Sequence, residues 1–533
     1  MGWNLGYNTD LGYTFGYYRE QDPTWLDLCA LVHGVRPPAL AGEKRLRYLE
    51  LGCGQGVNLC LIADCHPEVD FVGIDFNPAH IAHAQALARA AGLTNVRFVE
   101  GNFVELGQTW PQELGQFHYA AAHGILSWIA KPVREGLYRC LDAALLSGGL
   151  VYLSYNTLPG WLSTFPVQHL LRLWQKREGL SSLAAIEVGQ KRLQALIDAQ
   201  ALMCRVLPAM KGRLDKFPQL DKNYLVQEYL HDVWTCFWFD ELDAELAPHK
   251  LTFAGTATAG DWYLPATLPA QHKELLSQFT DPIEREVMVD VLSNLSFRRD
   301  LWAKGHAPIW REEQRQALGE HRFALLNRPA PKEAGANPYQ YATSAGEVQG
   351  KPEVYAPLYD ALSQGPKTLV ELIAVPVASA PSAADAAPAA PTTRTLANTL
   401  QAVGLMLHAG HLALLPANAK PSDPKPAKAL NRALLAATAQ GAPYRHLVAA
   451  QLPWVITASD GDQMLAHLHL AHPKDDARAL GERFAAKLLA LGRGLAKDGQ
   501  PITEPAAVTA RAVELAAQFL EKTLPNWKRL GVV

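Results

Sequence analysis

The clearest pattern along the chain is an alternation of apolar and amphipathic runs between residues 46 and 158. Strand-like runs such as LRYLEL (46–51) and FVGID (71–75) are followed by segments with helical spacing of apolar residues, such as PAHIAHAQALARAAG (78–92). Strands and helices in strict alternation predict a parallel sheet that is covered by helices on both faces. We therefore expect an α/β domain with a Rossmann-like sheet.

The pattern changes after this domain. From about 160 to 325 the spacing of apolar residues becomes mainly helical, as in PVQHLLRLWQKRE (166–178) and IEREVMVDVLSNLSFRRDLW (283–302), which predicts a second, helical domain. Charged residues interrupt the second of these segments at helical spacing, so we expect them on a solvent-exposed helix face. They are Glu284, Arg285, Glu286, Asp290, Arg298, Arg299 and Asp300.

Four parts are predicted in all. They are an aromatic-rich lead-in segment (1–40), the sheet domain (41–160), the helical domain (161–330) and a C-terminal domain (350–533) with Ala/Pro-rich loops at 376–394 and 416–429. Within the C-terminal part, YAPLYDALSQG, TLVELI and TLANTLQAVGLMLHAGHLALLP predict three helices and a short hairpin, as in a winged-helix unit. Without a basic bias, such a unit favours protein binding or a scaffold role over DNA binding.

Composition narrows the class of protein. A chain of 533 residues is too long for one hydrophobic core, and its 49% hydrophobic and 19% charged residues are typical of globular domains. The net charge of -3 argues against nucleic acid as a partner, because phosphate binding needs an excess of Lys and Arg. The first twenty residues lack a signal peptide's basic start, and no apolar run approaches 18 residues, so we expect a cytoplasmic protein without membrane insertion.

The seven cysteines are scattered and include no CxxC pair. We therefore expect reduced, mostly buried thiols and no metal site.

The most informative motif is YLELGCGQG (48–56), in which a strand ends in Gly52, Gly54 and Gly56 directly before a helical run. The spacing is GxGxG, so the GxGxxG pattern of dinucleotide binding is not met. An acidic residue ahead of the glycines, here Glu50, is typical of S-adenosylmethionine sites, because that cofactor presents an ammonium instead of a pyrophosphate. Cys53 lies in the same turn and joins the predicted cofactor site.

Asp75 forms the second half of this motif pair. It ends the next predicted strand, where a carboxylate can accept hydrogen bonds from both ribose hydroxyls, and Phe76 follows it. After the third strand, Asn102 is placed to accept a hydrogen bond from the adenine amino group, and Phe103 offers a packing face.

Simpler roles remain open for two of these residues. Glu50 would then form a salt bridge with the lead-in helix, and Asp75 would cap the helix that begins at Pro78.

With these residues, the chain resembles the class I S-adenosylmethionine-dependent methyltransferases. More narrowly, it is similar to the bacterial group that carries a methyltransferase regulatory domain, which includes rickettsial outer-membrane-protein lysine methyltransferases. The narrower resemblance covers roughly the first 325 residues, and the remainder is similar only loosely. It rests on AHGILSWI (122–129), LSYNTLPGW (153–161), QEYLHDVWTCFWFDEL (227–242) and IEREVMVDVLSNLSFRRDLW (283–302).

Candidate acceptor-binding residues stand where the fourth and fifth strands end, since ligands bind at the carboxyl ends of parallel strands. His123 is placed to orient or deprotonate the acceptor and to border the cofactor, and Tyr155 and Asn156 to hydrogen-bond the acceptor. Trp128 and Trp161 are candidates for the pocket wall. His123, Tyr155 and the two tryptophans also suit a structural role, because aromatic residues and histidines at such positions are often part of the core.

The fourth strand is followed by AAAHG and not by a DPPY or NPPY tetrapeptide. Resemblance to the DNA adenine and glutamine amide methyltransferases is therefore lost, and nucleic acid bases are not expected as acceptors.

The lead-in segment carries Tyr13, Tyr17 and Tyr18 between glycines at Gly12 and Gly16. These tyrosines either fold over the cofactor as a lid or pack against the helical domain.

The resemblance implies a protein-lysine N-methyltransferase that acts on a cell-envelope protein, with S-adenosylmethionine as cofactor and a protein substrate held by the additional domains. Two alternatives stay open. One is a small-molecule O- or N-methyltransferase, and the other is a non-catalytic regulatory protein that binds the cofactor. A homodimer is also left open.

Overall fold

The computed structural model describes residues 15–305, 308–331, 333, 335–378, 394–416, 424–497 and 499–533. Tyr13, Gly12 and most of the two predicted Ala/Pro-rich loops lie outside these residues. The chain divides into two compact units. The smaller unit comprises Phe15–Thr24, Lys44–Glu100 and Ala413–Val533, and the larger unit comprises Trp25–Glu43 and Gly101–Leu412 among the described residues.

The main sheet has seven strands in the order β3-β2-β1-β4-β5-β7-β6. Pairing is parallel between β1 and β2, β2 and β3, and β4 and β5, whereas β7 runs antiparallel to both β5 and β6. The strands are β1 (Leu46–Leu51), β2 (Val69–Asp75), β3 (Val96–Glu100), β4 (Phe117–Ala122), β5 (Leu145–Asn156), β6 (Leu251–Thr256) and β7 (Phe297–Lys304). An antiparallel strand next to β5 distinguishes this sheet from the dinucleotide-binding order. The predicted Rossmann-like fold is confirmed.

Strands β6 and β7 correct two details of the prediction, because they make the sheet mixed and interrupt the segment that was expected to be mainly helical. Helix α14 (Pro282–Ser293) ends early, and the chain continues as β7. Charged side chains hid this strand, since a buried strand is normally apolar. Asp290, Arg298 and Asp300 are 0%, 4% and 1% exposed, so the predicted solvent-exposed face is wrong for these three residues.

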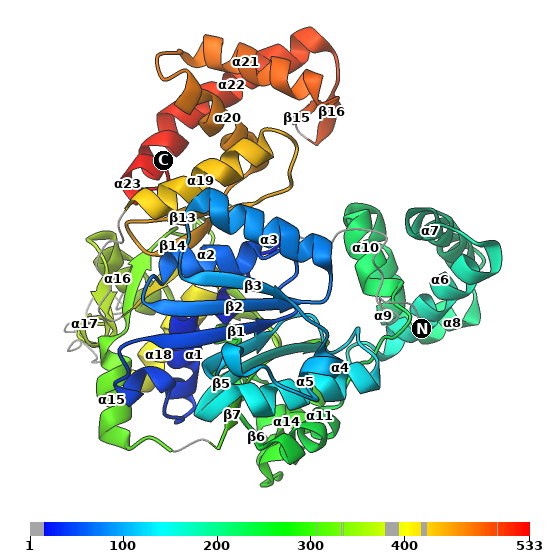
Figure 1. Cartoon of the computed structure of the whole chain (residues 1–533), viewed down its shortest axis with the longest axis vertical. Coiled ribbons are helices and arrows are strands. Elements are labelled where there is room, and N and C mark those ends of the chain that lie inside the picture. The colour runs from blue at the N-terminus through cyan, green and yellow to red at the C-terminus, as the bar shows by residue number, and fades with distance from the viewer. Residues whose placement is uncertain are drawn as a thin grey trace, which may run out of the picture. The chain divides into compact units, whose positions relative to one another are not determined.

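In the smaller unit, helices α2 (Val57–Cys65) and α3 (Pro78–Ala91) follow β1 and β2. The sequence sets both ends of α3, because the Asn77 side chain accepts a hydrogen bond from the Ala79 amide and Gly92 closes the helix in the left-handed conformation. Every residue of α2 is buried. The cover comes partly from the C-terminal segment, in which α19 (Pro424–Thr438) packs against α2 and α3 (Figure 1).

The rest of the C-terminal segment of this unit is helical with two small hairpins. Its elements are β13 (His446–Ala449), β14 (Trp454–Thr457), α20 (Asp460–Ala471), α21 (Ala477–Ala490), β15 (Leu495–Lys497), β16 (Gln500–Ile502), α22 (Pro505–Gln518) and α23 (Leu524–Leu530). Strands β13 and β14 contact α2.

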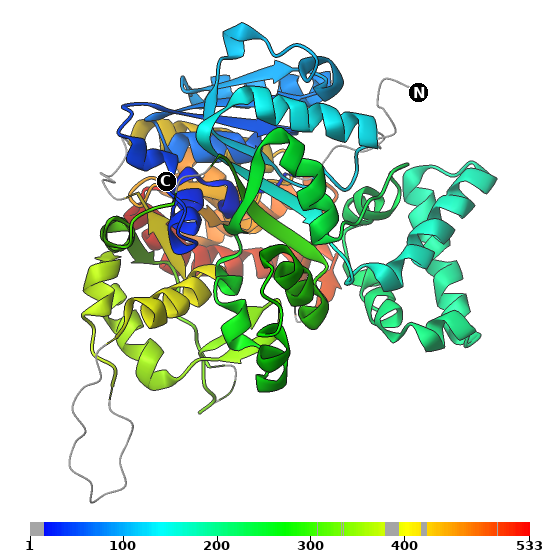
Figure 2. The ribbon, with the colours of Figure 1, turned by 90° about the horizontal axis from the view of Figure 1, so that it is seen from below.

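In the larger unit, a helical insertion follows β5. Its helices are α6 (Phe165–Glu178), α7 (Ser182–Asp198), α8 (Leu202–Val206), α9 (Pro208–Leu214) and α10 (Lys222–Tyr229). Apolar residues between Leu158 and Leu230 form a hydrophobic cluster of their own. Figure 2 shows α6 to α9 set to one side of the strands β5, β6 and β7 of the same unit.

The remaining elements of the larger unit flank the sheet. They are α1 (Pro23–Val32), of which Pro23 and Thr24 belong to the smaller unit, α4 (Phe103–Leu106), α5 (Lys131–Ala144), α11 (Phe239–Leu246), α12 (Leu264–Thr267), α13 (Ala270–Leu276), α15 (Arg311–Glu320), α16 (Pro352–Ser363), α17 (Leu369–Ile373) and α18 (Leu396–His408). The hairpin β9 (Gln340–Thr343) and β10 (Gly346–Gln349) precedes α16. A small sheet has the order β11-β8-β12, from β8 (Arg322–Leu325), β11 (Lys367–Thr368) and β12 (Leu412–Leu415), of which Ala413–Leu415 belong to the smaller unit.

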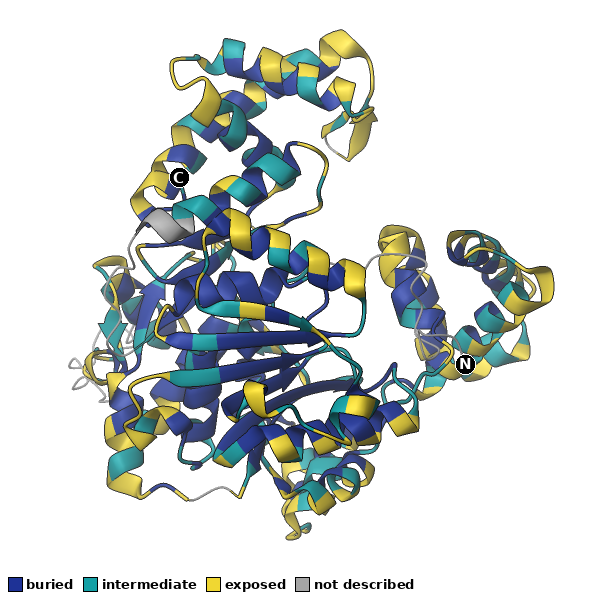
Figure 3. Ribbon diagram, viewed as in Figure 1, coloured by how far each residue is buried: buried dark blue, intermediate teal, exposed yellow. Residues whose placement is uncertain are grey.

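The main strands form the core. Strand β4 is buried over its whole length, and the last eight residues of β5 are buried as well. Figure 3 shows this as dark blue ribbon along the strands, with exposed positions on the outer faces of the helices. Side chains that remain accessible at strand ends are therefore the natural candidates for chemistry.

Candidate active site

The glycine turn closes over the end of β2. Gly52 donates its amide hydrogen to the carbonyl oxygen of Ile74 at 2.7 Å. Gly52, Gly54 and Gly56 have φ angles of 76°, 53° and 73°, in the left-handed region that favours glycine. At Gly56 a Cβ atom would also lie 2.4 Å from the Cβ atom of Ala84 in α3. The backbone conformation and the packing of α3 therefore both require glycine in this turn.

Asp75 lies beside this turn and is 6% exposed. Its Oδ2 atom accepts a hydrogen bond from the Gly54 amide at 2.9 Å, and Oδ1 accepts from the Asn77 amide at 2.9 Å and lies 3.3 Å from His80 Nδ1. The helix cap of α3 is Asn77, so Asp75 does not serve as the cap. A carboxylate has about four lone-pair sites, so it retains capacity for a hydroxyl donor.

Glu50 is a buried carboxyl group with one unsatisfied oxygen. Its Oε1 atom accepts a hydrogen bond from Asn58 Nδ2 at 3.4 Å, and Asn58 in turn accepts from the backbone amide of Tyr18 at 3.0 Å. Its Oε2 atom has no hydrogen-bond partner among the described residues. Burial raises the pKa of Glu50 to about 8, against the effect of the Asn58 hydrogen bond. The lead-in therefore reaches Glu50 through Asn58.

Cys53 and Phe76 are the other predicted residues of this group. The Cys53 thiol is buried and donates to the carbonyl oxygen of Gly54 at 3.7 Å. Burial raises the pKa of Cys53 well above its usual value, so this thiol is not a nucleophile. Phe76 is half-buried directly after Asp75.

The described part of the lead-in packs within the smaller unit. The ring of Tyr17 lies 5.6 Å from that of His446 in β13, and Phe15 packs edge-on against Tyr444 at 5.2 Å. The expected packing of these tyrosines against the helical domain is therefore wrong for Tyr17, whose partner belongs to the C-terminal segment. The role of a lid stays a prediction.

In the larger unit, Asn102 caps α4. Its side-chain oxygen accepts a hydrogen bond from the Val104 amide at 2.9 Å, and Phe103 is buried directly after it. The second lone pair of that amide oxygen can still accept, so the predicted adenine contact stays a prediction.

His123 follows β4 and contacts two hydroxyl groups of β5. Its Nδ1 atom lies 2.9 Å from the Tyr152 hydroxyl and 3.1 Å from Ser154 Oγ. Burial, followed by the nearby guanidinium of Arg299, lowers the pKa of His123 to about 3. The imidazole is thus neutral near pH 7 and too weak a base to take a proton from an acceptor.

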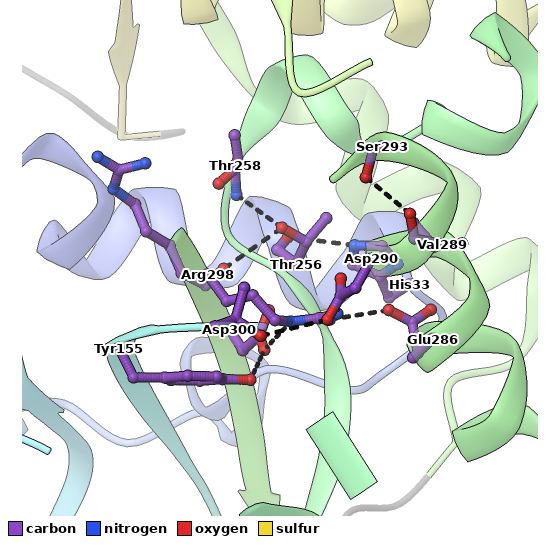
Figure 4. A network of polar contacts seen from close by, with 12 residues as sticks. His33, Tyr155, Thr256, Thr258, Glu286, Val289, Asp290, Ser293, Arg298 and Asp300 are labelled. Carbon is purple, nitrogen blue, oxygen red and sulfur yellow. Dashed lines mark hydrogen bonds and ion pairs between the residues drawn. The ribbon is translucent and has the colours of Figure 1, made fainter. Parts of the chain in front are cut away.

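Tyr155 belongs to a buried charged network. Its hydroxyl donates to Asp300 Oδ2 at 2.5 Å, and Arg298 binds Asp300, Asp290 and Glu286 at 2.7, 2.7 and 2.8 Å (Figure 4). Tyr155 is 1% exposed. Its hydroxyl therefore stabilises this network, and the geometry gives it no opening toward an acceptor.

Asn156, the last residue of β5, has a different environment. Its amide donates to Ser127 Oγ at 2.8 Å, and its side-chain Nδ2 donates to Glu228 Oε1 at 3.3 Å. Burial raises the pKa of Glu228 to about 7, although Asn156 and Tyr224 both hydrogen-bond to this carboxyl group and oppose the rise. Glu228 is closely surrounded by other groups, and part of its surface remains accessible to solvent.

Three tryptophan rings pack together in adjoining segments, since Trp128 follows Ser127, the partner of Asn156, and Trp161 contacts Tyr229, the residue after Glu228. Trp234 stacks parallel to Trp128 at 6.4 Å and packs edge-on against Trp161 at 5.2 Å. The Trp161 indole donates to the carbonyl oxygen of Ser296 at 2.5 Å, and the Arg213 guanidinium lies 3.8 Å from the Trp161 ring centre. Trp128 and Trp161 are buried, at 8% and 6% exposed, so much of their surface belongs to the core.

Known proteins identify the family. A methyltransferase domain matches residues 43–153, and a predicted methyltransferase regulatory domain matches residues 221–304. An uncharacterized protein of Synechocystis is 37% identical over 372 residues, which cover 70% of this chain and 72% of that protein. The chain belongs to the methyltransferases that carry this regulatory domain.

Two further relatives extend the match. An uncharacterized protein of Rickettsia prowazekii is 30% identical to this methyltransferase over 53% of the chain and 50% of its own length. The structure of PKMT2 from Rickettsia typhi in complex with AdoHcy matches with a TM-score of 0.65 at 18% identity, over 96% of this chain and 98% of that one. The fold is therefore shared over nearly the whole length.

The methyltransferase uses S-adenosylmethionine as its methyl donor. The residues of the glycine turn fit that molecule, because the buried Oε2 atom of Glu50 lacks a partner among the described residues and an ammonium would supply one. Asp75 retains capacity for the ribose hydroxyls. Which residues hold the cofactor is developed below as a proposal.

Three further observations describe the methyltransferase. None of the seven cysteines, all of which lie in the described residues, forms a disulfide bond, and five are buried. In the part of the chain that the structure describes, no three His, Cys, Asp or Glu side chains are grouped so as to hold a metal ion. None of the helices in the described ranges has both the length and the apolar character that a membrane crossing requires.

Sequence reasoning missed Glu228, Trp234 and the hydroxyl pair of Tyr152 and Ser154. Glu228 lies in the segment QEYLHDVWTCFWFDEL, which was noted only for its resemblance to the family. The available signal was a carboxylate between apolar and aromatic residues at a helix end. Burial of such a charge is costly unless other groups stabilise it.

Proposed function

We propose that this methyltransferase transfers the methyl group to lysine side chains of a protein. The observation that carries the proposal is the Asn156–Glu228 pair at the end of β5, with the aromatic rings of Trp128, Trp161 and Trp234 gathered nearby. The shared fold with PKMT2 over nearly the whole chain supports it, since the additional elements beyond the sheet are shared as well.

A lysine acceptor must lose its proton before its nitrogen can attack. Glu228 suits this step, because a carboxyl group whose burial raises its pKa to about 7 can accept a proton near neutral pH. An acceptor amine placed beside the buried Glu228 would also be partly desolvated, which disfavours its ammonium form. Asn156 then holds the Glu228 carboxylate in place through its side-chain amide.

S-adenosylmethionine, when bound, supplies a methyl group that is attached to a sulfonium. The sulfur is the leaving group and departs as a neutral thioether. The neutral amine nitrogen forms the new bond to carbon as the sulfur–carbon bond breaks, and the product amine carries the positive charge. Aromatic faces such as those of Trp128 and Trp234 tolerate that cation. Enclosure of the acceptor excludes water and fixes the direction of attack.

For the cofactor, we assign the ribose hydroxyls to Asp75 and the ammonium to Glu50. The Gly52–Gly56 turn allows close approach of the backbone. His123 remains neutral and acts by hydrogen bonding, in line with its pKa of about 3. We also propose that the protein works in the cytoplasm, which the free and mostly buried thiols support.

The test uses the full-length protein with methyl-labelled S-adenosylmethionine and a fractionated bacterial lysate that includes cell-envelope proteins. We expect label in a protein fraction and mass spectrometry to locate it on lysine. Asp75→Ala, which should not bind the cofactor, is the control for non-enzymatic labelling.

Other outcomes would contradict the proposal. Label confined to the low-molecular-weight fraction would favour a small-molecule methyltransferase. Cofactor binding without any labelled product would favour a non-catalytic regulatory protein.

A further inference from the structure

A side chain of α3 contacts the backbone of the glycine turn. The Nδ1 atom of His83 lies 2.8 Å from the carbonyl oxygen of Gln55, the residue between Gly54 and Gly56. A carbonyl oxygen can only accept, so Nδ1 carries the proton of this hydrogen bond. His83 therefore fixes the orientation of the peptide unit that joins Gln55 to Gly56.

Tyr444 of the C-terminal segment binds the other nitrogen of this imidazole. It lies between α19 and β13, and its hydroxyl is 2.7 Å from His83 Nε2. Because Nδ1 of the neutral ring carries the proton, Nε2 is the acceptor and the Tyr444 hydroxyl donates to it. Burial raises the pKa of Tyr444 to about 12, so this hydroxyl keeps its proton near neutral pH. Tyr444 thus favours the tautomer of His83 that can donate to the turn.

The lead-in segment packs against both side chains. The ring of Phe15 lies edge-on to the rings of His83 and Tyr444, at 5.6 and 5.2 Å between ring centres. Tyr444 is 5% exposed and His83 is half-buried, so water has limited access to the hydrogen bond between them. Phe15, Gln55, His83 and Tyr444 all belong to the smaller unit, so these contacts lie within one compact part of the chain.

The glycine turn depends on such contacts for its shape. Gly52, Gly54 and Gly56 all have left-handed φ angles, and glycine loses more conformational freedom on ordering than any other residue. Where only a fraction of the molecules holds the binding conformation, the apparent affinity for the ligand falls by that fraction. A hydrogen bond that fixes a carbonyl group of the turn raises this fraction.

We propose that His83 and Tyr444 are positioning residues for the cofactor, through which the C-terminal segment raises the affinity of the glycine turn for S-adenosylmethionine. Neither side chain has to touch the cofactor, because both act on the conformation of the turn before binding. The inference rests on the assignment of the cofactor to this turn under the proposed function, which Asp75→Ala tests separately.

The test measures the affinity of the full chain for the demethylated product, S-adenosylhomocysteine, by calorimetry, together with the Tm of each variant. Tyr444→Phe keeps the ring and removes the hydroxyl, so it should weaken binding by about fivefold, the effect of one neutral hydrogen bond. Thr438→Val is the matched control, because it removes from the same segment a buried hydroxyl that donates to Gln463 and not to His83. It should lower the Tm by a similar amount and leave the affinity unchanged.

Substitutions of His83 separate a positioning role from plain stabilisation. His83→Leu removes the donor to Gln55 and should weaken binding at least as much as Tyr444→Phe does. Adding Tyr444→Phe to His83→Leu should not weaken it further, because Tyr444 acts through His83. In His83→Asn, the side-chain amide can donate to Gln55 without help from Tyr444. We expect this variant to bind as the wild type does, and Tyr444→Phe to have no effect in its background.

Wild-type affinity in Tyr444→Phe would overturn the inference, and so would effects of Tyr444→Phe and His83→Leu that simply add. An equal loss of affinity in Thr438→Val would assign the effect to the stability of the segment and would overturn it as well. If Asp75→Ala keeps the wild-type affinity, the assignment of the turn is wrong and this inference fails with it. A loss in Asp75→Ala with none in Tyr444→Phe refutes the positioning role alone.

Discussion

The glycine turn and the proposed acceptor site, the Asn156–Glu228 pair, are built in opposite ways. The polar contacts of the glycine turn join residues close in sequence, since Gly54 and Asp75 are 21 positions apart and Glu50 and Asn58 are 8 apart. At the proposed acceptor site, Asn156 meets Glu228 across 72 positions. In the neighbouring network of Arg298, Tyr155 meets Asp300 across 145. Under the proposed function, the local contacts hold the cofactor and the long-range Asn156–Glu228 pair meets the acceptor.

The buried carboxyl groups of the two regions differ as well. Glu50 leaves one oxygen unsatisfied among the described residues, whereas Glu228 is hydrogen-bonded by Asn156 and Tyr224. Burial raises the pKa of Glu50 to about 8 and that of Glu228 to about 7. Desolvation is the main cause of both shifts, so the two carboxyl groups differ in their hydrogen-bond partners and not in the origin of the raised pKa.

The largest effect is expected from Asp75→Ala. Loss of hydrogen bonds to two ribose hydroxyls should weaken S-adenosylmethionine binding by about 100-fold or more, at about 1.5–3 kcal/mol per bond to a charged group. Calorimetry with the demethylated product measures this. Asp70→Ala is the matched control, because Asp70 lies on the same strand and pairs with Arg45 at the surface. Unchanged affinity in Asp75→Ala would refute the ribose assignment.

Glu228→Gln should lower kcat by about 100-fold or more while cofactor binding stays intact, since general base catalysis contributes about 10²–10⁴-fold. In the wild type only the ionised carboxylate accepts a proton, so kcat/KM should rise as the pH increases through about 7. The variant should lose that inflection. Glu187→Gln, an exposed carboxylate of α7, serves as control. A variant with the wild-type pH profile would exclude Glu228 as the base.

A smaller effect is expected from His123→Asn. The pKa of about 3 leaves His123 neutral throughout the assay range, so the pH profile should keep its shape. Loss of hydrogen bonds to a neutral group should reduce kcat by less than about tenfold. If the inflection near pH 7 disappears in this variant and persists in Glu228→Gln, the roles of the two residues are exchanged.

The smallest effect on catalysis is expected from Tyr155→Phe. The hydroxyl stabilises Asp300 within the network of Arg298, so its removal should cost about 1–3 kcal/mol of stability and lower the Tm. Steady-state kinetics below the Tm should give a kcat close to that of the wild type. A large loss of kcat with an unchanged Tm would place Tyr155 in contact with the acceptor after all.

Much of the fold could be predicted because its signals are local. The glycine turn, Asp75 and strands β1 to β5 each lie in a short segment whose pattern has one favoured structure. β7 could not be predicted in this way, because Arg298 and Asp300 are buried only through partners on α14 and β5. Glu228 was missed for the same reason, since its hydrogen-bond partner Asn156 belongs to a distant segment of the sequence.

The complete burial of α2 limits how the enzyme can be dissected. Residues 413–533 shield this helix, through α19, β13 and β14, although they follow it by some 350 positions. A fragment that ends before them would expose an apolar helix that begins at the cofactor turn, and it would be expected to aggregate. The C-terminal segment is thus a structural part of the smaller unit, and any minimal version of the enzyme must retain it.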